Sequence, residues 1–199
     1  FVSVSFGGWS ASSINLSWSD DEGKTWQPAK KIIASPFANI SSLVRTPPLF
    51  FKDGGVGLAT YHEMIGKFSE FLHLDALGNV VHKSRMSWGR DAIQPMIIPS
   101  SLTNAVNFMR YCGKGEPRVW KSKTEDGGLS WDEPEPIELP NPNAAVAGLR
   151  LSDGGILLAF NNSADSRDDM SIARSDDNGT TWLVLYSFEK VKKGEGGTR

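Results

Sequence analysis

Short, mostly apolar runs alternate with Gly- and Asp-rich turns along the whole chain, and helical periodicity is almost absent. Representative runs are Val56–Ala59, Val106–Met109 and Ile156–Phe160, each of which leads into polar or aromatic residues. Runs of four or five residues bounded by turn-forming residues are typical of β-strands rather than of amphipathic helices. The pattern therefore predicts an all-β protein with short strands.

One turn motif occurs three times. Its pattern is Ser/Thr-x-Asp-x-Gly-x-Ser/Thr-Trp, found at Ser19–Trp26, Thr124–Trp131 and Ser175–Trp182. The Asp side chain can accept hydrogen bonds from backbone amides just ahead of it, and the Gly can adopt the positive φ of a tight turn. The Trp can then pack the turn back onto the sheet. We predict structural roles for the recurring positions of this motif: Asp21, Gly23, Trp26, Asp126, Gly128, Trp131, Asp177, Gly179 and Trp182.

The turns recur with a period close to fifty residues. Asp126 and Asp177 are 51 positions apart, and Asp21 and Asp126 are 105 apart, about two periods. A degenerate copy is therefore expected near position 75, where the turn Asp75–Asn79 lacks the Trp. Two Asp-Gly-Gly turns, at positions 53 and 153, repeat in the same phase.

Each period contains four strands, with the Asp turn before the last of them. A fixed four-strand repeat is typical of β-propeller blades. A β-sandwich with similar hairpins is the alternative, but sandwiches do not repeat with this period. We predict a single, partial propeller domain over residues 1–199, with blades at about 1–37, 38–90, 91–141 and 142–190 and a tail at 191–199.

Composition narrows the function classes. The 199 residues include 21 basic and 23 acidic side chains, for a net charge of −2, which argues against a nucleic-acid partner. No run approaches the roughly 20 apolar residues of a membrane span, so we expect no membrane partner. Cys112 is the single cysteine, and the three histidines have no metal-ligand spacing. We predict no metal and no cofactor.

Candidate ligand-binding residues follow from propeller geometry. The starts of the innermost strands and the ends of the second strands face one opening of the central channel. Aligning the blades by their Asp-Gly-Gly turns brings Tyr61, Arg110 and Asn161 to equivalent second-strand ends. Apolar strands that end in polar residues at one rim are what a ligand-binding mouth requires. We predict that the ligand-binding residues are Arg45, Arg110, Gln94, Tyr111, Asn143, Asn161 and Asn162.

The three turns resemble the Asp-box (BNR) repeat of sialidase-type propellers, and their context resembles the bacterial predicted-neuraminidase branch of that superfamily. The resemblance covers roughly residues 1–185. It implies a six-bladed ring, so four blades would be completed by residues outside this sequence or by another chain, unless the closure is unusually compact. The matching stretches are Phe6–Trp9, Leu43–Pro48, Tyr61–Glu63, Ala92–Pro95, Leu139–Asn143 and Leu149–Asn162.

The resemblance also implies a chemistry. Sialidases bind a sugar carboxylate with three arginines, whose planar forks pair bidentately with it, and they use a Tyr nucleophile activated by a Glu, with an Asp as acid/base. Arg45 and Arg110 would be clamp members. Tyr61 and Glu63 lie two apart on one strand and would form the Tyr–Glu pair.

Other positions leave the chemistry open. His62 beside Glu63 is a second acid/base candidate, since a neighbouring carboxylate raises the pKa of a histidine. The family's Arg-Ile-Pro motif is absent, and Asp91 and Asp165 are acid candidates by proximity alone. The expected function is an exo-glycoside hydrolase acting on a terminal acidic sugar, with a carbohydrate or glycoconjugate as partner. Asp boxes also occur in non-hydrolytic propellers, so the alternatives are a non-catalytic binding propeller and a purely structural one.

Overall fold

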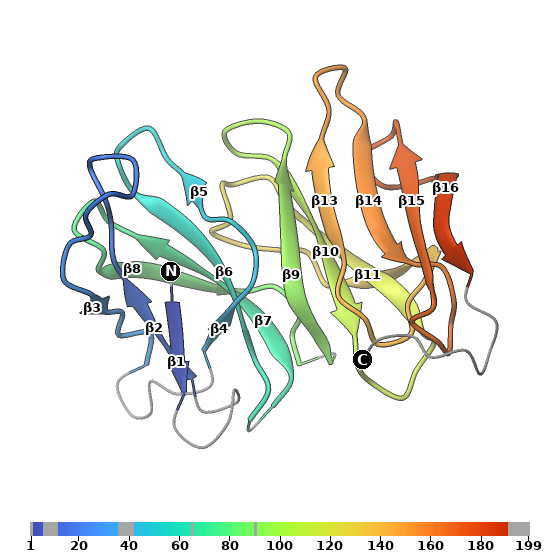
Figure 1. Cartoon of the computed structure of the whole chain (residues 1–199), viewed down its shortest axis with the longest axis horizontal. Coiled ribbons are helices and arrows are strands. Elements are labelled where there is room, and N and C mark those ends of the chain that lie inside the picture. The colour runs from blue at the N-terminus through green and yellow to red at the C-terminus, as the bar shows by residue number, and fades with distance from the viewer. Residues whose placement is uncertain (1, 6–11, 36–41, 65, 90, 191–199) are drawn as a thin grey trace.

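The structure, a computed structural model, describes residues 2–5, 12–35, 42–64, 66–89 and 91–190. Within these ranges the regular elements are β-strands, which form four antiparallel sheets in chain order (Figure 1). No helix among these residues is long and apolar enough to cross a membrane. The stretch Phe6–Trp9 and the tail 191–199 lie outside the described residues. The prediction of an all-β fold is confirmed.

The first two sheets differ in their inner strands. The first has three strands in the order β1–β2–β3, and the second has its inner strand in two short segments, β4 and β5, that both pair with β6. The order then continues through β7 to β8. The bounds are β1 (Val2–Ser5), β2 (Ser12–Leu16), β3 (Lys30–Lys31), β4 (Leu43–Val44), β5 (Leu49–Phe50), β6 (Val56–His62), β7 (Phe68–Leu74) and β8 (Val80–Arg85).

The third and fourth sheets each have four strands that pair in sequence order, β9 to β12 and β13 to β16. This up-and-down order is that of a propeller blade. The bounds are β9 (Ala92–Pro99), β10 (Ala105–Tyr111), β11 (Arg118–Thr124), β12 (Glu135–Pro140), β13 (Ala147–Arg150), β14 (Ile156–Asn161), β15 (Asp169–Ser175) and β16 (Leu183–Lys190). The blade limits given above remain a proposal.

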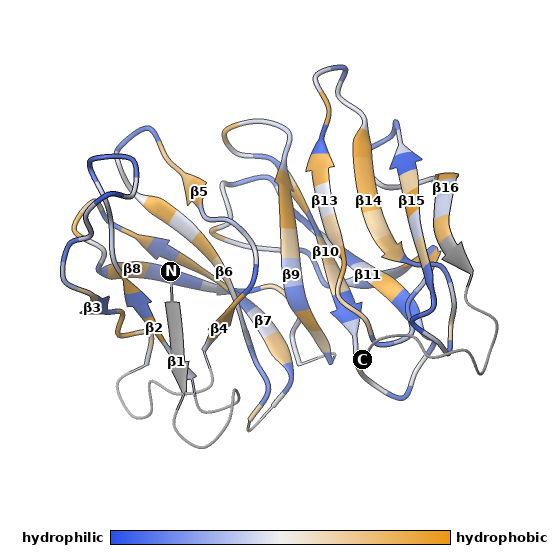
Figure 2. Cartoon of the chain, viewed as in Figure 1, coloured by the Kyte–Doolittle hydropathy of each residue, from blue (hydrophilic) through white to orange (hydrophobic). Residues whose placement is uncertain are grey.

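The core lies between neighbouring sheets. One buried cluster joins β10 to β14 and includes Phe108, Leu158 and Phe160, and a second joins β7 to β9 and includes Phe71. In Figure 2 the apolar stretches run along the middle strands of each sheet, and polar residues gather at the turns. The sheets therefore stack face to face, as blades do, with the first and the fourth at the two ends of the row (Figure 1).

Each Asp-box turn joins the last two strands of its sheet. In the first, the backbone N–H of Thr25 donates to Asp21 Oδ1 (2.8 Å) and the Thr25 hydroxyl to Oδ2 (2.6 Å). Gly23 has φ of +85°, and its N–H donates to the Ser19 hydroxyl (2.8 Å). The predicted turn chemistry is therefore present.

The Trp residues behave less uniformly than predicted. Trp131 is 5% exposed and meets Phe71 of the preceding sheet edge to face, with ring centroids 5.8 Å apart, and Trp182 meets Phe108 in the same way at 5.4 Å. Trp26 is 65% exposed, so the packing expected of it is not found among the described residues. Trp131 and Trp182 each pack against an aromatic ring of the preceding sheet, and that partner lies outside the Asp-box motif.

Candidate functional site at the strand ends

Arg110, at the end of β10, is the centre of the candidate site. Its Nε donates to Asn143 Oδ1 (2.7 Å) and its Nη1 to Gln94 Oε1 (3.3 Å). Burial lowers the pKa of Arg110, the positive charge of Arg167 lowers it further, and the charge of Glu63 opposes both effects. Arg110 is thus a half-buried cation whose hydrogen-bond partners are neutral amides from two sheets.

The two amides come from strained backbone. Gln94 and Asn143 have backbone φ angles of +56° and +55°, values that residues other than Gly seldom adopt. Gln94 lies in β9 where the pairing with β10 shifts register, and Asn143 lies in the connection that leads into β13. Both residues therefore hold Arg110, and their contact with a ligand stays a prediction.

Tyr61 lies in β6, and Glu63 follows the last residue of that strand. Both groups act to raise the pKa of Arg110 electrostatically. Burial raises the pKa of Glu63, and the charges of Arg110 and Lys67 partly offset that rise. Tyr61 is 8% exposed and packs in a cluster with Leu43 and Ile93.

His62 is engaged elsewhere. Its Nε2 lies 2.9 Å from Glu70 Oε2, and its ring stacks on Phe68 with centroids 4.4 Å apart. Glu70 is buried, and Lys83 and Arg85 also approach its Oε1 at 3.8 and 3.2 Å. A catalytic role for His62 stays a prediction that this ion pair does not support.

Three arginines from three sheets contact one short segment, residues 143–146. Arg45 Nη1 donates to the carbonyl of Val146 (3.0 Å), and Arg167 Nη2 donates to the carbonyl of Asn143, whose side chain holds Arg110. Arg45 and Arg167 are exposed. Sequence reasoning missed Arg167; the signal available was its place shortly after Asn161, at the same rim as Arg110.

The other predicted residues have structural contacts. Tyr111 stacks on Trp120 with centroids 5.0 Å apart, and its hydroxyl accepts from the Gly115 N–H (2.7 Å). Asn161 is 6% exposed and donates from Nδ2 to the carbonyl of Arg167 (3.0 Å). Asn162 pairs through its backbone N–H with the carbonyl of Asp169 (2.7 Å). Their predicted ligand contacts remain untested, and Asn161 contributes by holding the loop that carries Arg167.

The acid candidates lie on two sides of this rim. The carbonyl of Asp91 accepts from Cys112 N and Sγ, both at 2.9 Å, and Asp91 is among the charges that affect the Cys112 thiol, whose pKa is raised chiefly by burial. Asp165 Oδ1 accepts from the Ser163 hydroxyl (2.9 Å) in the loop of Arg167. Across the described residues no three His, Cys, Asp or Glu side chains are grouped so that they could hold a metal ion.

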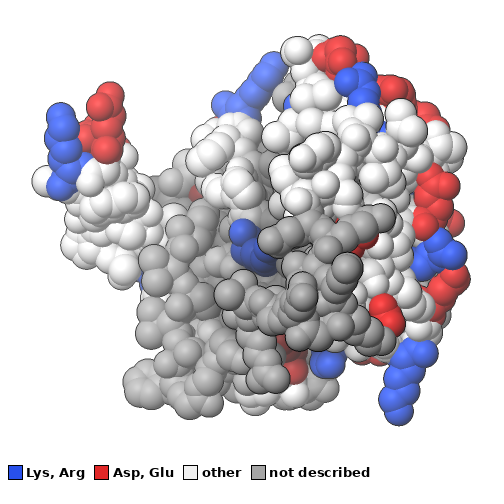
Figure 3. Space-filling view, turned by 45° about the vertical axis from the view of Figure 1, so that its right-hand side comes forward, with Lys and Arg blue, Asp and Glu red and all other residues white. Residues whose placement is uncertain are grey.

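Charge elsewhere on the surface is mixed. Figure 3 shows acidic and basic side chains interspersed along the right-hand edge of the described surface. This pattern agrees with the net charge of −2. The three arginines that contact residues 143–146 are therefore identified by the backbone segment that they share.

Solved structures with this fold are sialidases and other propellers. The chain superposes on the NanB sialidase of Streptococcus pneumoniae with a TM-score of 0.70 at 16% identity, over 89% of this chain and 28% of that one. For the intramolecular trans-sialidase of Ruminococcus gnavus the TM-score is 0.69 at 19% identity, over 90% and 41%. An α-L-arabinanase of Penicillium chrysogenum gives 0.64 at 13% identity, over 92% and 57%.

These comparisons confirm the predicted fold. The chain spans 28% to 57% of the length of those three proteins, so it covers only part of the propeller. No curated protein matches the sequence. The model of the BNR repeat-like domain matches residues 1–196. The sialidase-type resemblance of the Asp boxes is confirmed, and the chain belongs to the BNR repeat-like domain family.

Proposed function

We propose that the protein is a sialidase-type exo-glycoside hydrolase whose mouth binds the carboxylate of a terminal acidic sugar. One observation carries the proposal: Arg110 is half-buried and is held by Gln94 and Asn143, which are neutral. A guanidinium with neutral partners keeps its charge for a ligand, and its fork fits a carboxylate. In this proposal Arg45 and Arg167, which contact the same backbone segment as Arg110, are the other two arginines of the clamp.

Tyr61 and Glu63 supply the chemistry in this proposal. The Tyr61 oxygen attacks the anomeric carbon while Glu63 takes the phenolic proton, and an acid gives a proton to the departing oxygen. In a second step, water attacks the anomeric carbon and gives its proton to the conjugate base of that acid, while Glu63 returns its proton to the departing Tyr61 oxygen. Burial raises the pKa of Glu63, which makes its carboxylate a stronger base toward the phenolic proton. Asp91 and Asp165 stay alternative acids.

The second candidate function is carbohydrate binding without turnover. It is favoured by the burial of Tyr61, which is 8% exposed and packed against Leu43 and Ile93. A nucleophile has to reach the anomeric carbon, so a tyrosine held in an apolar cluster fits a binding site better than a reacting one. Both candidates use Arg110 in the same way.

The test is hydrolysis of an aryl sialoside, with sialyllactose binding measured in parallel. Arg110→Ala should abolish both, and Arg110→Lys should weaken binding because a point charge cannot replace the fork. Arg174→Ala is the matched control, since Arg174 pairs with Asp153 and Asp176 at the opposite strand ends.

Three results are informative. Turnover that Tyr61→Phe abolishes supports the hydrolase, and binding without turnover across a panel of aryl glycosides supports the second candidate. Neither binding nor turnover would overturn both. Arg174→Ala should leave either signal unchanged.

A further inference from the structure

A cavity of about 340 Å³ lies between the third and the fourth sheet. It is lined by the start of β10, the end of β11 and the fourth-sheet Asp-box turn. Val106 of this lining is four residues along β10 from Arg110, roughly 13 Å at about 3.3 Å per residue. Lys121 is nearer, since it pairs with Phe108, but neither Arg110 nor its partners Gln94 and Asn143 line the cavity.

The corresponding space between the second and third sheets is filled by aromatic rings. Phe71 pairs with Ala59, three residues before the end of β7, and Lys121 pairs with Phe108 at the same point of β11. Counted in the same way from the ends of the two strands, His73 of β7 corresponds to Lys123 of β11. Two aromatic positions of β7, whose rings meet edge to face with centroids 4.9 Å apart, thus correspond to two lysines of β11.

Both Asp-box turns lie over an aromatic ring of the preceding sheet. A Cβ placed on Gly128 would lie 2.5 Å from the Phe71 ring, and one placed on Gly179 would lie 2.5 Å from the Phe108 ring. Lys121 is the cross-strand partner of Phe108, and its Nζ donates to the carbonyl of Gly179 (3.3 Å). The cavity is lined by Lys121, Lys123 and Val106.

The lining carries a net positive charge. Lys123 is balanced by Glu125 and Asp132, whose oxygens lie 3.1 and 3.7 Å from its Nζ. Lys121 is half-buried, and among the described residues its one hydrogen bond is to the Gly179 carbonyl, with no carboxylate within 4.0 Å. An ammonium has three donors, so Lys121 keeps charge and donors for a ligand.

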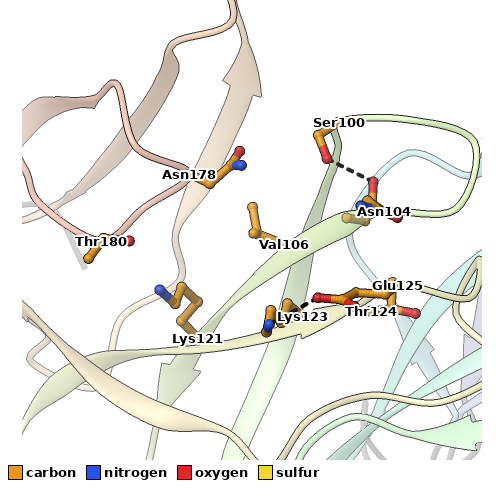
Figure 4. A pocket seen from close by; sticks show the side chains of 10 residues that line it. Ser100, Asn104, Val106, Lys121, Lys123, Thr124, Glu125, Asn178 and Thr180 are labelled. Carbon is orange, nitrogen blue, oxygen red and sulfur yellow. Dashed lines mark hydrogen bonds and ion pairs between the residues drawn. The ribbon is translucent and has the colours of Figure 1, made fainter.

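The other walls are polar, and the floor is apolar. Figure 4 shows Asn178 and Thr180 on one side, Ser100 and Asn104 on the other, and Val106 between them. Hydroxyl and amide groups around a small apolar floor suit a hydroxylated ring, and the volume is near the lower end for ligand pockets, about 300–1,000 Å³.

We propose that this cavity binds a small hydroxylated anion of the size of one sugar acid. The carboxylate of the ligand pairs with Lys121 Nζ, and its hydroxyls bond to the side chains of Asn104, Asn178 and Thr180. Its ring covers Val106. This site is independent of the proposed function of the mouth.

The experiment is an NMR titration of the ¹⁵N-labelled chain with glucuronate at millimolar concentration, compared with glucose. The side-chain amide signals of Asn104 and Asn178 should shift when glucuronate is added. Glucose should bind at least about tenfold more weakly than glucuronate, because it cannot form the charge-assisted hydrogen bond to Lys121. Lys121→Gln should weaken glucuronate binding about tenfold for the same reason. Lys24→Gln, at an exposed lysine of the first Asp box, is the matched control and should change nothing.

A second variant fills the cavity. Lys121→Phe removes the ammonium group and places a ring in the space that the ligand would occupy, so it should abolish glucuronate binding. Equal binding of glucose and glucuronate would overturn the proposal. So would unchanged affinity in Lys121→Gln, or shifts that Arg110→Ala abolishes and Lys121→Gln does not, because these assign the binding to the mouth.

Discussion

The Asp boxes of the first and the third sheet share their hydrogen bonds but not their surroundings. Asp21 and Asp126 each accept from the backbone N–H four residues ahead, at 2.8 and 2.9 Å, and from that residue's hydroxyl, at 2.6 Å in both. Trp26 is nevertheless 65% exposed and Trp131 5%. The exposed Trp26 indole donates to its own turn, at the Gly23 carbonyl (3.2 Å).

The comparison separates the motif into two parts. The Asp and hydroxyl residues close a turn from local sequence alone, so this part is the same in both boxes. The Trp stabilises the fold only where a preceding sheet offers an aromatic partner, as Phe71 does for Trp131. The same eight-residue pattern therefore closes a hairpin in one place and joins two sheets in another.

The largest expected difference between the boxes is at the Trp itself. Trp131→Ala removes a buried ring and leaves a cavity beside Phe71, so the free energy of unfolding should fall by about 3–5 kcal/mol. Trp26→Ala should change it by less than about 0.5 kcal/mol, as exposed substitutions usually do. Urea unfolding of the two variants measures the contrast. Equal losses would show that Trp26 has a partner in solution and would break the comparison.

The box glycines should show a smaller contrast of the same sign. Both have positive φ, +85° at Gly23 and +89° at Gly128, but only at Gly128 does a new Cβ meet a ring of the preceding sheet, 2.5 Å from Phe71. Gly128→Ala should therefore cost about 2–4 kcal/mol, from backbone strain and overpacking together, and Gly23→Ala about 1–2 kcal/mol, from strain alone.

Thermal unfolding distinguishes the two glycine variants. A double variant, Gly128→Ala with Phe71→Leu, should recover part of the loss, because the smaller side chain makes room for the methyl group. If Gly128→Ala and Gly23→Ala lower the melting temperature equally, strain dominates and the sheet contact at Gly128 is weak.

Much of the fold was predictable because its signals are local. An Asp, a Gly and two hydroxyl residues close each turn within eight positions, and the period of about fifty residues follows from counting. The same phase led to Arg110, Gln94 and Asn143, which do meet. Exposure of Trp26 was not predictable, because it depends on the neighbouring sheet and not on the motif.

The rest of the site lay beyond sequence reasoning for similar reasons. Arg167 lies in an irregular loop between β14 and β15, where no period fixes its position relative to Asn143. Tyr111 stacks on Trp120 of the next strand, a pairing that depends on register. The cavity at Lys121 depends on which side chains of β10, β11 and the fourth-sheet turn face one another, and the order of residues in the sequence does not show this.

The smallest expected effect tests whether the polar part of the box is independent of the neighbouring sheet. Hydrogen bonds from the Thr25 side chain and backbone lower the pKa of Asp21 to about 2, from an ordinary value of 3.8. Burial acts to raise the pKa of Asp126, but the hydrogen bonds from Ser130 and Thr124 outweigh it and bring that pKa also to about 2. Because both folded-state values are depressed, the stabilisation is complete above pH 3.8 and is lost as the pH falls toward 2.

The urea midpoint should therefore fall between pH 4 and pH 2. Asp21→Asn and Asp126→Asn should each make this decrease in the urea midpoint smaller, and by a similar amount. The reason is that an amide cannot titrate and that the two carboxylates accept the same hydrogen bonds. A flattening in Asp126→Asn with none in Asp21→Asn would show that the preceding sheet, through Trp131 and Phe71, also sets the geometry of the carboxylate. The two parts of the motif would then be coupled, and the exposed box would be the weaker turn as well as the unpacked one.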